Sequence, residues 1–284
     1  MTDRVRQLWD FDDLDGTEER FQDRLTDEAD SERAEILSQL ARIQGLRGDF
    51  DAGERLVEEA QVLAGDDERA RARIDLERGR LRQSRGNREA ALPLFESGFA
   101  IALEAGELFI AADAAHMAAL AAPDREAFVA WTERGIEVAT AHEDASYWLG
   151  PLLNNLGWEL YEAGELDAAL DAFERALEAR EQEPENQAAI EIARYAVGKT
   201  LRALGRPRLG IPYLERAVAW AKHVGVADGW FHEELAEEYA AVGRLDEARD
   251  QARLALPLLE EADPGFVEDS ERAARLRDLA HVDA

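Results

Sequence analysis

The chain has 284 residues, of which 46% are hydrophobic, with no cysteine and a formal net charge of −29. This hydrophobic content suffices for a folded core, and the absence of cysteine excludes disulfides, thiolate nucleophiles and thiolate metal sites. The negative charge argues against nucleic-acid and anionic-membrane partners, because both attract basic surfaces.

The amino-terminal stretch lacks the apolar run of a signal peptide, and no stretch has the ~18 or more apolar residues of a bilayer-spanning helix. We therefore expect a cytoplasmic protein. The basic residues are nearly all arginine, with lysine only at Lys199 and Lys222. The acid excess and the scarcity of lysine fit a salt-loving host or a GC-rich genome. Alternatively, the acidic surface is simply solvated and indicates nothing about a binding partner.

The first 30 residues predict a lead-in followed by a short helix. Residues 1–16 hold Trp9 and Phe11 among acidic residues, which indicates an irregular segment that docks on the first helices. Residues 17–28 predict a helix, with Thr17 as its N-cap.

A pattern of two amphipathic segments joined by a turn then recurs over residues 31–262. It is clearest in 149–182, where each segment has apolar residues at the spacing of one helix face. These residues are Leu153, Leu156, Gly157 and Leu160 in the first segment and Ala169, Phe173, Ala176 and Leu177 in the second. The small Gly157 and Ala169 let the two helices cross closely, with the Phe173 ring beside them.

This stretch resembles a tetratricopeptide repeat (TPR). The matching residues are Leu156, Gly157, Ala169 and Phe173, whereas Leu153, Leu160 and the displaced Pro184 depart from the family's Trp, Tyr and closing Pro. The resemblance implies an all-α fold, a right-handed α-solenoid of about six helical hairpins.

The turns of the repeated pattern are spaced about 37–41 residues apart, farther than the 34 of a minimal TPR. They lie at Gly48, Gly86, Pro123, Gly164, Gly205 and Gly243, with a degenerate repeat at Pro123. Glycine suits a left-handed turn after a helix. Pro93 and Pro212 fall early in second helices, where the TPR family often has a proline. Pro257 lies deeper and predicts a kink or an end.

We expect a single domain over residues 1–284, because no linker divides the chain and each repeat needs its neighbours. Its parts are a lead-in and helix over 1–30, six helix pairs over 31–262, and one capping helix over 263–284. The cap is expected because an array of repeats exposes an apolar end unless a polar-backed helix covers it.

Two fragments of catalytic motifs do not extend to complete sites. A Gly-Lys-Thr sequence ending at Thr200 resembles the end of a phosphate-binding loop, but Ala193 replaces the loop's first glycine in a predicted helix. A His-Glu pair begins at His232, but Ala236 replaces the second histidine of a zinc-protease motif. We therefore expect no enzymatic activity, no cofactor and no metal site.

The resemblance implies that the first helices line a concave groove that holds extended peptides or helices of partners. Helical phase relative to the core predicts which side chains face this groove. The predicted peptide-binding residues are Arg42, Arg73, Arg80, His116, Asn154, Trp158, Tyr161, Tyr195, Lys199, Arg202 and Trp230. The same phase places Ser38, Leu76, Ala112, Glu233 and Glu237 on this face.

The predicted groove is basic and aromatic, although the whole chain is strongly acidic. We therefore expect a non-enzymatic protein–protein interaction scaffold whose partner is an acidic or carboxylate-bearing peptide or protein segment. One alternative is structural: the arginines neutralise acids on adjacent helices, and Trp158 packs between first helices. Another is a ligand-sensing regulator that closes on a small peptide or metabolite. Self-association through Trp131 and Trp220, both expected to be exposed, stays open as well.

Overall fold

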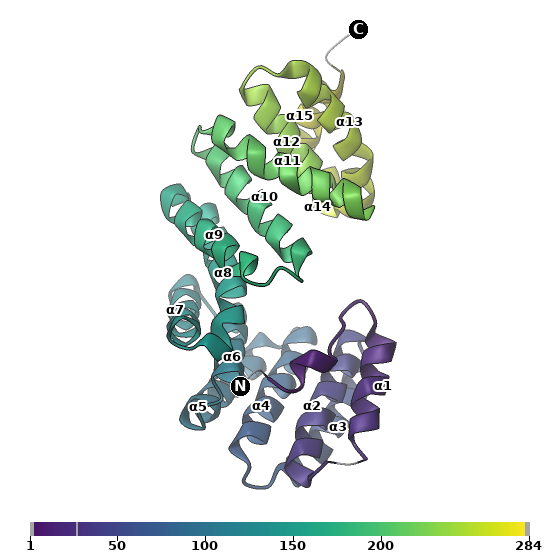
Figure 1. The fold of residues 1–284 in the computed structure, drawn as a ribbon, viewed down its shortest axis with the longest axis vertical. Coiled ribbons are helices and arrows are strands. Elements are labelled where there is room, and N and C mark those ends of the chain that lie inside the picture. Colours follow the sequence, from purple (N-terminus) through teal and green to yellow (C-terminus); the bar gives the residue numbers. More distant parts are fainter. Residues whose placement is uncertain (1–2, 27, 282–284) are drawn as a thin grey trace. The chain divides into compact units, whose positions relative to one another are not determined.

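The computed structural model describes residues 3–26 and 28–281. Within these residues the chain forms helices and no β-strand, which confirms the predicted all-α class (Figure 1). The contacts divide the chain into two compact units, Met1–Leu152 (unit 1) and Leu153–Ala284 (unit 2). The single-domain organisation stays a prediction. None of the described helices is both long and apolar enough to span a bilayer.

Unit 1 alternates first and second helices after a short lead-in. Its elements are the 3-10 helix η1 (Arg6–Leu8), α1 (Leu14–Arg24), α2 (Asp30–Leu46), α3 (Phe50–Ala64), α4 (Glu68–Ser84), α5 (Arg88–Glu104), α6 (Leu108–Ala121), α7 (Arg125–Ala141) and the 3-10 helix η2 (Glu143–Trp148). The unit boundary falls inside α8 (Leu149–Glu162).

Unit 2 continues the same alternation and ends in two shorter helices. Its further elements are α9 (Leu166–Glu181), α10 (Gln187–Ala203), α11 (Pro207–Val224), α12 (Gly229–Ala241), α13 (Leu245–Ala262), α14 (Pro264–Glu268) and α15 (Ser270–His281). Each predicted turn lies between a first helix and the second helix that follows it in the chain.

The turns inside the hairpins have the conformation that their glycines predict. Gly48 and Gly164 have φ angles of 80° and 76°, in the left-handed region that a residue without Cβ adopts at little cost. Gly86, Gly205 and Gly243 share this conformation. The degenerate turn between α6 and α7 ends instead at Asp124, whose side chain accepts a hydrogen bond from the Ala127 backbone nitrogen at 2.9 Å.

The close helix crossing predicted for α8 and α9 is present. A Cβ atom at Gly157 would lie 2.5 Å from Cε1 of Phe173, which is fully buried. Gly79 of α4 has the same relation to the Phe95 ring of α5. Glycine at these sites allows a large ring from the second helix to fill the crossing, as close packing of the interior requires.

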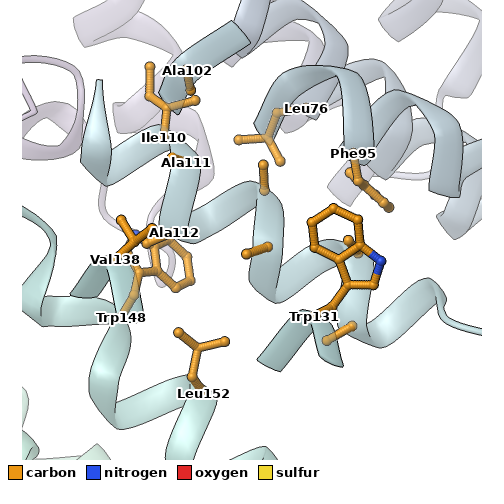
Figure 2. Close-up of a cluster of buried hydrophobic side chains, with 14 of the residues drawn as sticks. Leu76, Phe95, Ala102, Ile110, Ala111, Ala112, Trp131, Val138, Trp148 and Leu152 are labelled. Carbon is orange, nitrogen blue, oxygen red and sulfur yellow. The ribbon is translucent and has the colours of Figure 1, made fainter. Parts of the chain in front are cut away.

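A buried cluster around α6 forms much of the core of unit 1 (Figure 2). Small residues such as Ala112 leave room on α6 for Trp131 from α7 and Trp148 from η2, which flank the helix on opposite sides. Trp131 is only 8% exposed and packs edge-to-face on Phe99, with ring centroids 5.3 Å apart. The expectation that Trp131 is exposed is therefore wrong, and Trp220 is half-buried.

The first helix begins three residues earlier than predicted, and its cap is a different residue. Asp13 is the N-cap of α1 and accepts a hydrogen bond from the Gly16 backbone nitrogen at 2.9 Å. Thr17 is instead buried, and its hydroxyl donates to the Asp10 carbonyl oxygen at 2.9 Å. Aspartate caps helices at least as well as threonine, so the earlier start is physically reasonable.

The carboxyl-terminal region differs from the prediction in two ways. The expected single capping helix is two helices, because the Asp269 side chain accepts a hydrogen bond from the Arg272 backbone nitrogen at 2.9 Å and starts α15. In addition, α13 does not end at Pro257 but runs to Ala262. The fully buried Leu259 anchors this last stretch. The last helix, α15, packs against α13.

Candidate functional site

In unit 2, the predicted residues of α8 and α10 lie together on one surface. We call this group the unit-2 surface; it consists of Trp158, Tyr161, Tyr195, Lys199 and Arg202. The ring centroids of Trp158 and Tyr161 are 5.7 Å apart, and those of Trp158 and Tyr195 are 6.4 Å apart. The Lys199 Nζ atom lies 5.6 Å from the Tyr195 ring centroid.

Both cations of the unit-2 surface bind the same carboxylate, Glu234 of α12. Lys199 Nζ donates to Glu234 Oε2 at 3.0 Å, and Arg202 donates through Nε and through Nη2, the latter at 3.1 Å. The Glu234 side chain is 2% exposed, whereas those of Lys199 and Arg202 are 24% and 30% exposed. Both cations are partly open to solvent, and the charge of Glu237 also acts on Arg202.

The three charges hold one another in their ionised forms. Burial lowers the pKa of Lys199, but the Glu234 carboxylate outweighs this effect and leaves the pKa raised. Burial raises the pKa of Glu234, but the hydrogen bond from Arg202 and the charge of Lys199 leave it lowered. Burial also raises the pKa of Tyr195 to about 12, so its hydroxyl stays protonated at neutral pH.

A second buried carboxyl group lies one helical turn after Glu234 and lacks such partners. Glu238 is fully buried, and among the described residues neither of its carboxyl oxygens has a hydrogen-bond partner. Gly210 of α11 makes room for it, because a Cβ there would collide with the Glu238 carboxyl group. Burial, followed by the charge of Glu234, raises the pKa of Glu238 to about 8, so this group is mostly neutral at pH 7.

The remaining predicted residues of unit 2 border this surface or support it. Trp158 packs on Phe173 of α9, the second helix of its own hairpin, with ring centroids 5.0 Å apart. The structural alternative expected packing between first helices, for which the contact is the 6.4 Å approach to Tyr195 of α10. Asn154 is half-buried on α8. Trp230, at the start of α12, is 37% exposed, and its neighbour Phe231 packs against Tyr195 at 5.7 Å.

The predicted positions on α12, Glu233 and Glu237, face the last helix instead. Arg272 of α15 donates to both Glu233 carboxyl oxygens at 2.6 and 2.5 Å, and Arg275 lies 3.5 Å from Glu237. Glu234, which the phase argument did not select, is the residue that meets the cations. The sequence therefore indicated the correct helix but missed the correct residue by one position.

In unit 1, the predicted arginines are already paired with carboxylates of the same chain. Arg73 is 3% exposed; its Nη2 donates to the two Asp3 carboxyl oxygens at 2.9 and 2.8 Å, and its Nε donates to Glu35 at 3.0 Å. Burial raises the pKa of Asp3, but the charge of Arg73 and its hydrogen bonds leave the pKa lowered. The Arg73 site therefore holds a complete ion-pair cluster.

Arg80 and Arg42 are also paired with carboxylates of the same chain, but their side chains are less deeply buried than that of Arg73. Arg80 donates to Glu77 at 2.7 Å and to Asp113 of α6. Arg42 lies 3.9 Å from Glu77, and its guanidinium lies 5.1 Å from the Trp9 ring centroid. Burial and the like charge of Arg80 lower the pKa of Arg42. These contacts are what the structural alternative for the arginines expected.

The other predicted positions of unit 1 lie inside the fold. Ser38, Leu76 and Ala112 are fully buried, because successive first helices α2, α4 and α6 pack against one another at these positions. The His116 ring packs against Trp148, with centroids 5.3 Å apart. Ser38, Leu76 and Ala112 therefore do not line a surface. The ligand-binding role of the other predicted residues stays a prediction.

The predicted docking of the lead-in on the first helices is confirmed. Trp9 Nε1 donates to Gln39 of α2 at 2.8 Å, and Arg4 donates to Glu35 of α2 at 2.9 Å. Sequence reasoning did not identify Asp3 as the partner of Arg73. The only signal for it was the position of this acid just ahead of the docking aromatic residues.

Models of the tetratricopeptide repeat match the chain at residues 150–182 and, for a second model, at 34–59 and 229–253. The first of these stretches is the one on which the sequence resemblance rests. No curated protein sequence matches the chain.

Several solved structures share the fold. A signal transduction ATPase with numerous domains (STAND) protein with a tetratricopeptide repeat sensor, from Pyrococcus horikoshii, superposes with a TM-score of 0.72 at 14% identity. That match covers 93% of this chain but 42% of the ATPase, so the chain spans less than half of that protein.

Two shorter proteins match over most of both chains. BtubC (BKLC) from P. vanneervenii has a TM-score of 0.61 at 20% identity, covering 78% of this chain and 93% of its own. The apo form of the quorum sensor NprR from B. thuringiensis has a TM-score of 0.58 at 12% identity. That match covers 97% of this chain and 85% of NprR. At these identities the likeness concerns the fold alone.

Proposed function

Because the chain is a tetratricopeptide repeat protein, we propose that it is a protein-interaction scaffold whose unit-2 surface binds a carboxylate-bearing peptide segment. One observation carries the proposal. Lys199 and Arg202 share the single buried carboxylate of Glu234 while keeping 24% and 30% of their side chains exposed. A carboxylate supplied by a partner would give these exposed parts of the two cations a second hydrogen-bonded anion.

The chemistry of the unit-2 surface fits this ligand. Arginine and lysine form charge-assisted hydrogen bonds to carboxylates, and these are stronger than bonds between neutral groups. Trp158, Tyr161 and Tyr195 lie beside the cations and offer rigid contact area for apolar or aromatic peptide side chains. We propose that Asn154 and Trp230 border the same site.

The proposal places the binding charge in unit 2 rather than in unit 1. Arg73 and Arg80 have carboxylate partners from their own chain and little exposed surface. We therefore propose that Arg42, Arg73, Arg80 and His116 contribute to ligand binding only after rearrangement of the lead-in.

An array of paired peptides tests the proposal. Each peptide is presented once with its acidic residues and once with the corresponding amides, and it is probed with the wild-type chain and with Lys199→Gln. This variant keeps the Arg202–Glu234 pair, so we expect it to fold. We expect acidic peptides to be retained by the wild type, and to bind Lys199→Gln at least ~10-fold more weakly, a loss of about 1.4 kcal/mol.

Lys222→Gln is the matched control, because it removes the other lysine from an exposed position on α11. Equal binding by Lys199→Gln and Lys222→Gln would contradict the proposal. Capture of no peptide by the wild type would instead favour the ligand-sensing regulator. That alternative is then tested by screening small peptides and metabolites for an increase in melting temperature.

A further inference from the structure

Residues 3–11, which we call the N-segment, lie against the first helices of unit 1 and contact α2, α4 and α6 (Figure 1). We propose that the N-segment is an internal ligand of this α2–α4–α6 face. When the N-segment leaves, the face binds a partner peptide that carries an acidic residue followed by an aromatic residue. This inference stands independently of the function proposed for the unit-2 surface.

The first part of the N-segment is anchored by a carboxylate. Asp3 is 3% exposed and receives hydrogen bonds from Arg73 at 2.9 and 2.8 Å and from Arg69 at 3.4 Å. Both arginines belong to α4, and both also bind Glu35 of α2. A helix face that presents two guanidinium groups to one side-chain carboxylate is a site for an acidic residue of any extended segment.

The second part of the N-segment is held by contacts between cations and aromatic rings. The Arg6 guanidinium lies 3.7 Å from the Tyr147 ring centroid. Further along, Arg42 of α2 lies 5.1 Å from the Trp9 ring centroid and 5.2 Å from that of Phe11. The face thus supplies a cation, Arg42, for aromatic side chains. In the N-segment, the short helix η1 separates these aromatic residues from Asp3.

The N-segment is packed only in part: Val5 lies in a buried apolar cluster, with Leu8 and Trp9 against it, whereas Gln7, Asp10 and Phe11 are exposed. Only Asp3 and Val5 of its residues are buried, and Phe11 is 57% exposed. A cavity of about 70 Å³ remains between the N-segment and the helices, lined by Trp9, Arg42 and Arg73 among others. Segments with few buried apolar contacts open at lower free energy than the core, so the N-segment can leave while unit 1 stays folded.

Departure of the N-segment takes Asp3 away from Arg73 of α4 and Arg4 away from Glu32 and Glu35 of α2. Arg73 would lose both bonds to Asp3 and keep its bond to Glu35, which it shares with Arg69, whereas Arg69 would also keep Glu107. Burying an incompletely paired charge is costly. A partner peptide that brings both a carboxylate and an aromatic ring restores the contacts that Asp3 and Trp9 make.

A labelled peptide of residues 3–13 tests the proposal against the full chain. The wild type is compared with the double variant Asp3→Asn/Trp9→Ala, in which the chain's own N-segment loses both anchors. We expect fluorescence anisotropy to show at least ~10-fold tighter binding to the double variant than to the wild type, because the internal ligand competes. Equal binding to both chains, or binding to neither, would overturn the proposal.

The matched control changes only the probe. A second labelled peptide carries Asp3→Asn and has the same length and aromatic residues, so the folding of the protein is unaffected. We expect it to bind the double variant at least ~10-fold more weakly than the unchanged peptide. Equal binding of the two peptides would show that the carboxylate does not anchor the segment, and would overturn the proposal.

Hydrogen exchange of the wild type tests the same idea without any variant. The backbone amides of Arg6, Leu8 and Trp9 donate to carbonyl groups inside the N-segment at 3.1–3.2 Å. We expect these amides to exchange at least ~10-fold faster than the central amides of α4, because they open with the N-segment alone. Exchange at the slow rate of α4 would show that the N-segment opens only with unit 1, and would overturn the proposal.

Discussion

The two units use cations on their first helices in different ways. In unit 1, Arg73 is buried and binds two carboxylates, Asp3 and Glu35. In unit 2, Lys199 and Arg202 are partly exposed and share one carboxylate. Cations on first helices, at different heights in the repeat, therefore become either a structural ion-pair cluster or a charged surface. The number of carboxylates that neighbouring elements supply decides between these outcomes.

The origin of the counter-ions explains this difference. Asp3 comes from outside the repeated pattern, 70 residues before Arg73, whereas Glu234 comes from the next first helix, 35 residues after Lys199. In both units a neighbouring first helix also supplies an acid, Glu35 of α2 to Arg73 and Glu234 of α12 to Lys199. The lead-in of unit 1 adds the further carboxylate that neutralises the cluster there.

The largest effect is expected from removing the buried cation of unit 1. Arg73→Ala leaves Asp3 and Glu35 buried with fewer partners, and breaking such a buried pair costs about 3–5 kcal/mol. We expect a marked decrease in the urea concentration at the unfolding midpoint, monitored by circular dichroism. Arg71→Ala, on the exposed side of α4, is the control and should change stability by less than ~0.5 kcal/mol. Similar midpoints for both variants would contradict the comparison between the units.

The next effect concerns pH and the unpaired Glu238 of unit 2. Its pKa is about 8 in the folded chain, against an ordinary value of 4.5. Between these values the folded state binds more protons than the unfolded state, so the free energy of unfolding falls as the pH rises. Glu238→Gln removes this dependence, and at pH 8 we expect the variant to be more stable than the wild type by about 2–4 kcal/mol.

Unfolding by urea at pH 5 and at pH 8 measures this effect. The control is Asp250→Asn, which removes an exposed carboxylate from α13 and should leave the pH dependence of the wild type unchanged. An equal change in the free energy of unfolding between pH 5 and pH 8 in the wild type and in Glu238→Gln would show that Glu238 is ionised in the folded chain. This result would contradict the prediction.

The smallest effect is expected where an ion pair lies at the surface. Arg47, at the end of α2, contacts Asp15 and Glu18 of α1 at 2.5 Å, but Asp15 is 92% exposed. Surface pairs contribute about 0–1 kcal/mol, so Arg47→Ala should cost less than ~1 kcal/mol, and less still in high salt. A loss as large as that of Arg73→Ala would mean that burial does not set the strength of these pairs.

Much of the fold could be predicted from the sequence because its determinants are local. The turn glycines need a positive φ whatever their neighbours are, and Gly48 and Gly164 have it. The crossing of Gly157 with Phe173 follows from one small and one large residue at fixed positions in the repeat. Such features depend on a few residues that are close in sequence.

The candidate site could be predicted only in part, because side-chain direction on a helix changes quickly. Adjacent residues point about 100° apart around the helix axis, so a shift of one position separates Glu234, which meets Lys199, from Glu233, which meets Arg272. The pairing of Arg73 with Asp3 was beyond spacing rules, because the lead-in has no periodicity that fixes its path.

The Arg69 side chain has a consequence for how unit 1 unfolds. Its guanidinium group reaches Glu35 of α2 at 3.0 Å and Glu107, the residue before α6, at 2.5 Å, while Arg69 itself belongs to α4. In most repeat arrays each hairpin interacts only with its immediate neighbours, so an end can fray one hairpin at a time. Here one side chain of the second hairpin binds acids on both sides, Glu35 of the first hairpin and Glu107 at the start of the third. Because one guanidinium group joins both interfaces of the second hairpin, the three hairpins should melt as a single cooperative block.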